Sequence, residues 1–162
     1  MNESTPDLDD FLLSLKWTET FALFFVFASD PVLKDGFLAR LDGLFPSELE
    51  RIEPSSHAAA AHEILGWVRA YPTDTVLRAP VLLDLSFGHD DPQWRGPRDN
   101  LLARLNESRE ILRQRMLRPV IIMLPVDYCP IIKETAPDLW SVRQSYGLRL
   151  DMDGDTNDGL RP

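Results

Sequence analysis

Long apolar runs alternate along this chain with amphipathic segments. Residues 21–28, FALFFVFA, are apolar throughout, as expected of a strand buried on both faces of a parallel sheet. We predict four further strands, at 49–53, 79–87, 118–125 and 146–150. Between them the sequence predicts helices, at 31–45, 54–72, 98–117 and in a short segment that ends before Pro137.

Strands that alternate with helical crossovers are typical of a parallel sheet, because each crossover must return the chain to the same end of the sheet. We therefore predict a single three-layer α/β domain of Rossmann-like or P-loop-like type, in which a mostly parallel sheet of about five strands carries helices on both faces. The domain is expected at 11–150, between acidic tails at 1–10 and 151–162, the second disordered. Ligands of such sheets bind at the carboxyl ends of the strands.

The charge of the chain is concentrated at its ends. The 162 residues contain 17 Lys and Arg against 26 Asp and Glu, for a net charge of −9. Residues 1–10 contribute −4 and residues 151–162 contribute −3, which leaves −2 for the body. An acidic protein is poorly suited to bind nucleic acid or a membrane surface.

Few features point to export or to metal chemistry. Cys129 is the only cysteine, so neither an internal disulfide nor a cysteine-rich zinc site is expected. The first ten residues do not resemble a secretory signal, and the longest apolar run is too short to span a bilayer. We expect a cytoplasmic protein without a cofactor.

One part of the sequence resembles a known family. An apolar strand ending VLLDLS, an LN..RE helix, the strand RPVIIMLP and the segment APDLWSVR follow one another over residues 79–143. This succession resembles the degenerate P-loop NTPase-type domain of bacterial STAND-like regulatory proteins, which are relatives of NLR immune receptors. The resemblance implies that 81–84 occupies the Walker B position and that PVIIMLP is the sensor strand.

The phosphate-binding loop of such a domain is absent from the sequence. A P-loop needs GxxxxGK[ST], since its glycines let backbone N–H groups approach the phosphates and its lysine reaches them. After the first strand this chain has ASDPVLKDGF, with one glycine, one lysine and an acid, Asp30, where a phosphate would bind. Nucleotide binding and hydrolysis are therefore not expected.

Asp84 lies inside an apolar strand, where a carboxylate is costly unless it is paired. It is either a structural residue, paired with an arginine or capping a helix, or a Walker B remnant. In the second case Asp84, His89 and Asp91 would form a cofactor-binding site around a divalent ion. Cys129 is a nucleophile served by His89, or an inert thiol with no basic neighbour to lower its pKa.

Arginines concentrate in the longest predicted helix and its flanks. Seven of them stand against three acids between residues 95 and 118, for a local charge of +4. They either are solvated or bind an acidic partner, an RNA or the chain's own tails. Trp94 and Trp140 are the tryptophans expected at the surface, whereas Trp17 and Trp67 are expected in the core. The predicted partner-binding residues are Trp94, Arg98, Arg109, Arg113, Trp140 and Arg143.

Together these patterns favour a non-catalytic interaction domain of a bacterial regulatory or defence system over an enzyme. We predict no catalytic residues, a protein partner and no membrane partner. Nucleic acid is disfavoured by the net charge, although the arginines keep it open. The alternative is a small metal-dependent enzyme or nucleotide sensor that uses Asp84 and the loop of His89 and Asp91.

Overall fold

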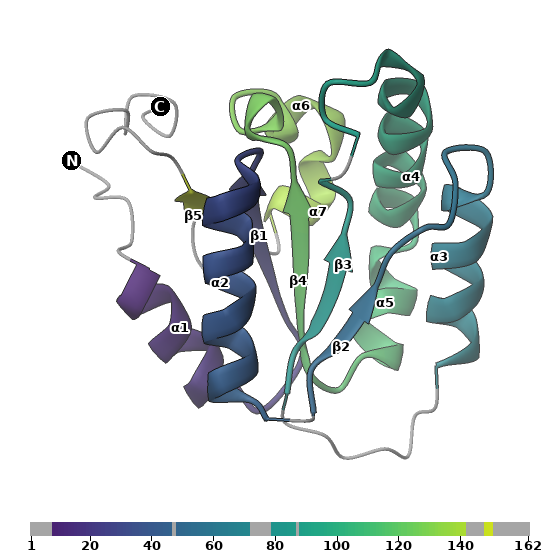
Figure 1. The fold of residues 1–162 in the computed structure, drawn as a ribbon. Coiled ribbons are helices and arrows are strands. Elements are labelled where there is room, and N and C mark those ends of the chain that lie inside the picture. The colour runs from purple at the N-terminus through teal and green to yellow at the C-terminus, as the bar shows by residue number, and fades with distance from the viewer. Residues whose placement is uncertain (1–7, 47, 72–78, 87, 142–147, 151–162) are drawn as a thin grey trace.

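The computed structural model describes residues 8–46, 48–71, 79–86, 88–141 and 148–150. The chain runs through helices and strands that alternate after an initial helix (Figure 1). In order, they are α1 (Leu8–Trp17), β1 (Ala22–Ala28), α2 (Pro31–Leu44), β2 (Glu50–Ile52), α3 (Ala60–Ala70), β3 (Val81–Asp84), the 3-10 helix η1 (Pro92–Trp94), α4 (Arg95–Glu107), α5 (Arg109–Arg115), β4 (Pro119–Leu124), the 3-10 helix η2 (Val126–Tyr128), α6 (Ile132–Thr135), α7 (Pro137–Ser141) and β5 (Leu148–Leu150).

The strands form one parallel sheet in the order β2-β3-β4-β1-β5. This confirms the predicted α/β class and the sheet of five strands. β1 lies inside the sheet, between β4 and β5, and every residue from Ala22 to Ala28 is buried. An apolar residue at each position is therefore required of β1, because both of its faces are covered by helices.

Successive residues of each strand point to opposite faces of the sheet. Leu23, Phe25 and Phe27 pack in a core with α3, α4 and α5, whereas Phe24 and Val26 pack in a second core with α1 and α2. Figure 1 shows the same division, with α1 and α2 on one side of the strands and α3, α4 and α5 on the other. The architecture has the three layers that the sequence predicts.

The start of α2 forms as the sequence predicts. The Asp30 side chain accepts hydrogen bonds from the N–H groups of Val32 and Leu33, at 2.8 and 3.2 Å, and Pro31 occupies the first helical turn. The cap fixes the point at which the chain leaves β1 at the carboxyl edge of the sheet.

Helix α1 is absent from the sequence prediction and changes the picture of the N-terminal region. Its Phe11, Leu12 and Leu15 are buried against β1 and α2. Trp17 was expected in the core, but it is 74% exposed, so that expectation is wrong. Three residues of the predicted acidic tail, 8–10, belong to this helix.

One predicted helix is interrupted in the structure, and another is followed by an additional helix. The predicted helix at 98–117 is divided at Ser108 into α4 and α5, although its apolar stripe packs against the sheet as expected. After β4, the short helix α6 ends before Pro137, as predicted, and α7 then begins at that proline. No helix in the described part of the chain is long and apolar enough to cross a membrane.

Candidate functional site

The carboxyl edge of the sheet is the place where ligands of this architecture bind. There the structure joins segments that follow β1 and β4, because the two strands are adjacent and parallel. The Ser29 hydroxyl accepts a hydrogen bond from the N–H group of Val126 at 2.9 Å. The candidate site is therefore this edge, formed by the residues that follow β1, β3 and β4.

Asp84 is fully buried at the end of β3 and is completely paired by protein groups. One carboxylate oxygen, Oδ2, contacts Lys34 Nζ from α2 at 2.9 Å and Arg51 Nη2 from β2 at 2.8 Å. The other, Oδ1, accepts hydrogen bonds from the N–H and hydroxyl groups of Ser86, at 3.1 and 2.7 Å. One alternative from the sequence was that Asp84 is a structural residue paired with an arginine, and the ion pair with Arg51 fits this alternative.

The partners of Asp84 decide its protonation state. Burial by itself would raise the pKa of the Asp84 carboxyl. Hydrogen bonds from Lys34, Ser86 and Arg51 outweigh burial and hold this pKa below its ordinary value. Asp84 is therefore a carboxylate at neutral pH, and its charge is neutralised by two side-chain cations.

The structure does not gather His89 and Asp91 around Asp84. His89 and Asp91 line an open hollow of about 300 Å³ together with Arg95, Arg98 and Asp127, and Asp84 is not part of its lining. The Asp91 carboxylate instead caps η1, where it accepts a hydrogen bond from the N–H group of Gln93 at 2.9 Å. Among the described residues, no group of three or more His, Cys, Asp and Glu side chains converges in a way that could hold a metal ion.

Trp94 is half-buried and folds back onto the protein rather than projecting from the loop. Its indole lies against Gly88 and 5.8 Å from the His57 ring, measured between ring centroids. Gly88 has a φ of 65°, and a Cβ atom built on it would lie 2.1 Å from Trp94 Cδ1. Glycine is thus required at position 88 both by the backbone conformation and by the tryptophan.

We expect Gly88→Ala to lower the free energy of unfolding by about 1–2 kcal/mol from the left-handed conformation alone, and by more if the indole cannot move away. The matched control is Gly96→Ala, because a Cβ atom at Gly96 in α4 would meet no atom within 4 Å. That change should leave stability equal or up to about 1 kcal/mol higher. Urea titration followed by tryptophan fluorescence measures both variants, and equal effects would contradict the packing described here.

Arg98, one of the predicted partner-binding residues, does not lie on an exposed arginine surface. Its side chain is buried, with 4% exposure, and its Nε donates a hydrogen bond to the carbonyl oxygen of Leu85 at 2.8 Å. The guanidinium groups of Arg98 and Arg95 lie 5.5 and 4.8 Å from the centroid of the Tyr128 ring. Arg98 thus joins α4 to the ends of β3 and β4.

Tyr128 lies at the same edge, after β4. It is fully buried, and its hydroxyl donates a hydrogen bond to Asp99 Oδ1 at 2.5 Å. Burial and the neighbouring carboxylate raise the pKa of Tyr128 to about 12, so the phenol is neutral at physiological pH. Arg95 forms a further ion pair with Asp127, at 3.0 Å, on the outer side of the ring.

The predicted cluster of seven arginines is divided by the fold. Arg118 is buried at the opposite, amino edge of the sheet, where it binds the segments that precede β2 and β3. Arg109 and Arg113 are exposed, but each forms an ion pair within the protein, with Asp138 of α7 and with Glu110. Arg143 lies outside the described residues. The exposed arginine surface is therefore smaller than the sequence suggests and partly neutralised.

Two other candidates lie in packed surroundings. Trp140, predicted at the surface, is half-buried, with its ring 5.5 Å from that of Phe25. Cys129 is buried, and burial raises the pKa of its thiol to about 11. The thiol is therefore protonated at neutral pH, as the inert alternative for this residue requires.

Sequence reasoning did not predict that Lys34 and Arg51 pair with Asp84. Lys34 follows the helix cap by one turn, which places it at the carboxyl edge, and that position was a usable signal. Arg51 reaches Asp84 only because β2 is the neighbour of β3, which no local pattern indicates.

No protein-family model matches this chain, and no curated protein matches it at the level of sequence.

Proposed function

We propose that this protein is a non-catalytic α/β interaction domain, derived from a nucleotide-binding ancestor, that acts by protein–protein contact in the cytoplasm. The setting that its resemblance to STAND-like proteins implies is a bacterial regulatory or defence system. The observation that carries the proposal is that charged side chains at the carboxyl edge, above all Lys34 and Asp84, pair with one another. A ligand-binding edge keeps such groups available, whereas here they bind one another.

The first support comes from Lys34 and Asp84. In a working P-loop protein the lysine reaches phosphate oxygens, and the Walker B aspartate holds the magnesium ion. In this chain the lysine of the first turn of α2 and the aspartate at the end of β3 form an ion pair with each other, at 2.9 Å. Each group neutralises the charge that would otherwise attract phosphate or metal.

The second support comes from the start of α2. A helix N-terminus binds phosphate through its free N–H groups. In α2 the Asp30 carboxylate already accepts hydrogen bonds from two of these groups. A phosphate would have to displace this carboxylate and would be repelled by its charge, which argues against nucleotide binding at the edge.

The proposal predicts that the full chain binds no nucleotide. Isothermal titration calorimetry with ATP or GTP, each with magnesium chloride, should show no saturable heat up to millimolar ligand. A Kd in the micromolar range would overturn the proposal. Asp30→Ala is the informative second variant, because binding gained only in this variant would show that the Asp30 cap is the group that excludes nucleotide.

The proposed contact surface consists of the loop 88–97, the exposed arginines of α5 and the helix α7. A partner would be captured through this surface by contacts with the half-buried Trp94 and by charge attraction to Arg109 and Arg113. Arg113→Glu should weaken capture of the partner from the native host. Arg69→Glu on α3 is the matched control, since it places the same charge change on another exposed arginine. Equal capture by both variants would remove α5 from the surface.

A further inference from the structure

Helix α1 presents apolar side chains on two opposite faces. Phe11, Leu12 and Leu15 are buried beneath the helix, whereas Leu13 and Trp17 are 54% and 74% exposed on its outer side. Leu13 and Trp17 are four residues apart and therefore lie on the same face. Large exposed apolar side chains that adjoin one another are typical of a surface that is covered by another protein.

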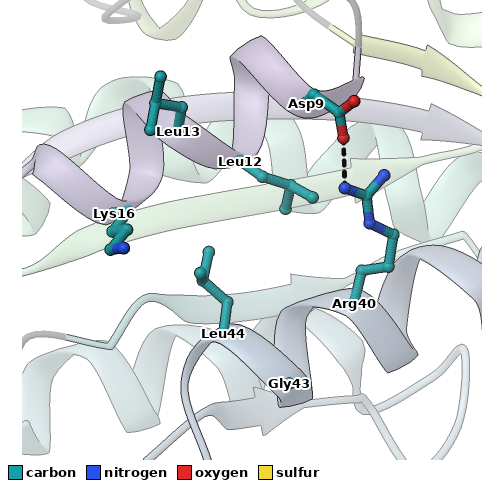
Figure 2. A pocket seen from close by; sticks show the side chains of 7 residues that line it. All are labelled: Asp9, Leu12, Leu13, Lys16, Arg40, Gly43 and Leu44. Carbon is teal, nitrogen blue, oxygen red and sulfur yellow. Dashed lines mark hydrogen bonds and ion pairs between the residues drawn. The ribbon is translucent and has the colours of Figure 1, made fainter.

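A groove runs beside Leu13, between α1 and α2. It has a volume of about 440 Å³, and Leu12, Leu13 and Leu44 form its apolar walls. Figure 2 shows Leu12 and Leu44 turned toward the space between the two helices, Leu13 on the side of α1 away from α2, and the ion pair of Asp9 and Arg40 at one end of the groove. Gly43 lies at the edge of the groove and leaves it open, because a Cβ atom there would meet no atom within 4 Å.

The charges of α1 are ordered along the helix. Asp9 and Asp10 lie in its first turn and Lys16 lies in its last. Asp10, Leu13, Lys16 and Trp17 are spaced by three and four residues, so they form one exposed stripe. Asp10 and Lys16 form no ion pair with any other residue that the structure describes, so both remain able to meet a partner's charge.

A second copy of this chain complements the stripe. If two α1 helices pack antiparallel about a two-fold axis at Leu13, each Lys16 faces Asp10 of the second copy. Each Trp17 then faces the first turn of the other helix, beside the groove. An isologous contact of this kind needs one self-complementary surface, which α1 supplies with its acidic start, apolar centre and basic end.

We propose that α1 and the groove between α1 and α2 form the interface of a homodimer, in which the α1 helices pack antiparallel across Leu13. Trp17 of each copy covers the groove of the other. Each copy contributes only one ten-residue helix and one groove to this contact, and small interfaces are typical of weak, transient association. The dimer is therefore weak and forms at micromolar or higher concentration. This interface is separate from the carboxyl edge and does not depend on the function proposed for that edge.

Sedimentation velocity of the full chain at about 5 to 500 µM tests the proposal, because this range brackets the affinity of a small interface. The sedimentation coefficient should rise with concentration from the monomer value to the dimer value. Leu13→Ser and Trp17→Ser should each raise the dimer Kd at least about tenfold, as expected for central apolar contacts. Leu117→Ser is the matched control, because Leu117 is also half-exposed but lies away from α1.

A charge exchange tests the antiparallel arrangement. Asp10→Lys and Lys16→Asp should each weaken the dimer, because each places like charges opposite one another across the axis. The double variant Asp10→Lys with Lys16→Asp restores opposite charges at both contacts and should recover most of the wild-type affinity. Circular dichroism of each variant separates this effect from loss of α1.

Three results would overturn the proposal. They are a wild-type chain that stays monomeric over the whole range, a dimer that is unaffected by Leu13→Ser and Trp17→Ser, and a double charge exchange that does not recover affinity. If the chain stays monomeric, the exposed stripe of α1 would be a contact surface for a different protein or for another segment of this chain. Failure of the charge exchange alone would exclude the antiparallel register.

Discussion

Replacing Asp84 by asparagine is expected to lower the free energy of unfolding by about 3 kcal/mol, at the low end for a broken buried ion pair. Asparagine keeps the shape of the side chain and can still accept a hydrogen bond from Ser86. It leaves Lys34, 16% exposed, and Arg51, 39% exposed, without the negative charge that neutralises them. Because Lys34 and Arg51 are both partly exposed to solvent, the loss of unfolding free energy should not exceed about 3 kcal/mol.

The effect of Asp84→Asn should depend on pH. The folded-state pKa of Asp84 lies below its ordinary value of 3.8, so the carboxylate stabilises the fold above about pH 4. This contribution is lost as the pH falls through the lowered folded-state pKa. Urea titrations of wild type and Asp84→Asn should therefore differ most at neutral pH and converge in strong acid.

Asp42→Asn is the control for the change at Asp84. Asp42 is an exposed residue of α2, so its substitution should alter stability by less than about 0.5 kcal/mol. An Asp84→Asn protein as stable as wild type, or more stable, would contradict the structural role assigned here. That result is typical of a carboxylate retained for binding or catalysis, because functional residues are often kept at the expense of stability.

Replacing Arg118 by methionine is expected to lower the free energy of unfolding by about 3–5 kcal/mol. The buried guanidinium donates hydrogen bonds to the carbonyl oxygens of Ala79, Pro80 and Glu48 and, at 2.8 Å, to the Tyr71 hydroxyl. An additional ion pair joins it to Glu50 at 3.4 Å. Methionine fills the volume but leaves these acceptors unpaired in the interior.

Arg115→Met is the matched control for Arg118→Met. Arg115 is exposed at the end of α5, three residues earlier in the chain, and its substitution should change stability by less than about 0.5 kcal/mol. Arg118→Lys should give an intermediate loss, because a single ammonium group cannot replace the planar fork that reaches several acceptors. Urea titration at neutral pH measures all three, and similar values for Arg118→Met and Arg115→Met would contradict the proposed role.

The two arginines show why the site could be predicted only in part. Arg115 and Arg118 are close neighbours in a charged segment, and both look like surface residues in the sequence. One is exposed, and the other is buried at the amino edge of the sheet. The difference arises because Arg118 directly precedes β4, and β4 lies beside β3 in the sheet. The distance between residues along the chain does not show which strands are neighbours in the sheet.

The tryptophans illustrate the same limit. Trp94 lies in a loop rich in proline and glycine, yet it is held against Gly88, while Trp17 follows a run of leucines and is exposed. Recognition of α1 as a helix would have placed Leu13 and Trp17 on the side opposite Phe11 and Leu15. The helical spacing of the apolar residues in this segment indicated the helix, but residues 1–10 were predicted as a tail because they are acidic.

The sequence by itself determined the class of the fold, the three apolar strands, the cap of α2 and the absence of a GxxxxGK[ST] motif after the first strand. These features are local, because an unbroken apolar run or an Asp-Pro cap has the same meaning wherever the chain places it. Only the tertiary structure decided which charges meet. The arrangement of strands and helices joins Asp84 to Lys34 and Arg51 and buries Arg98 and Arg118, since each of these outcomes depends on contacts between elements far apart along the chain.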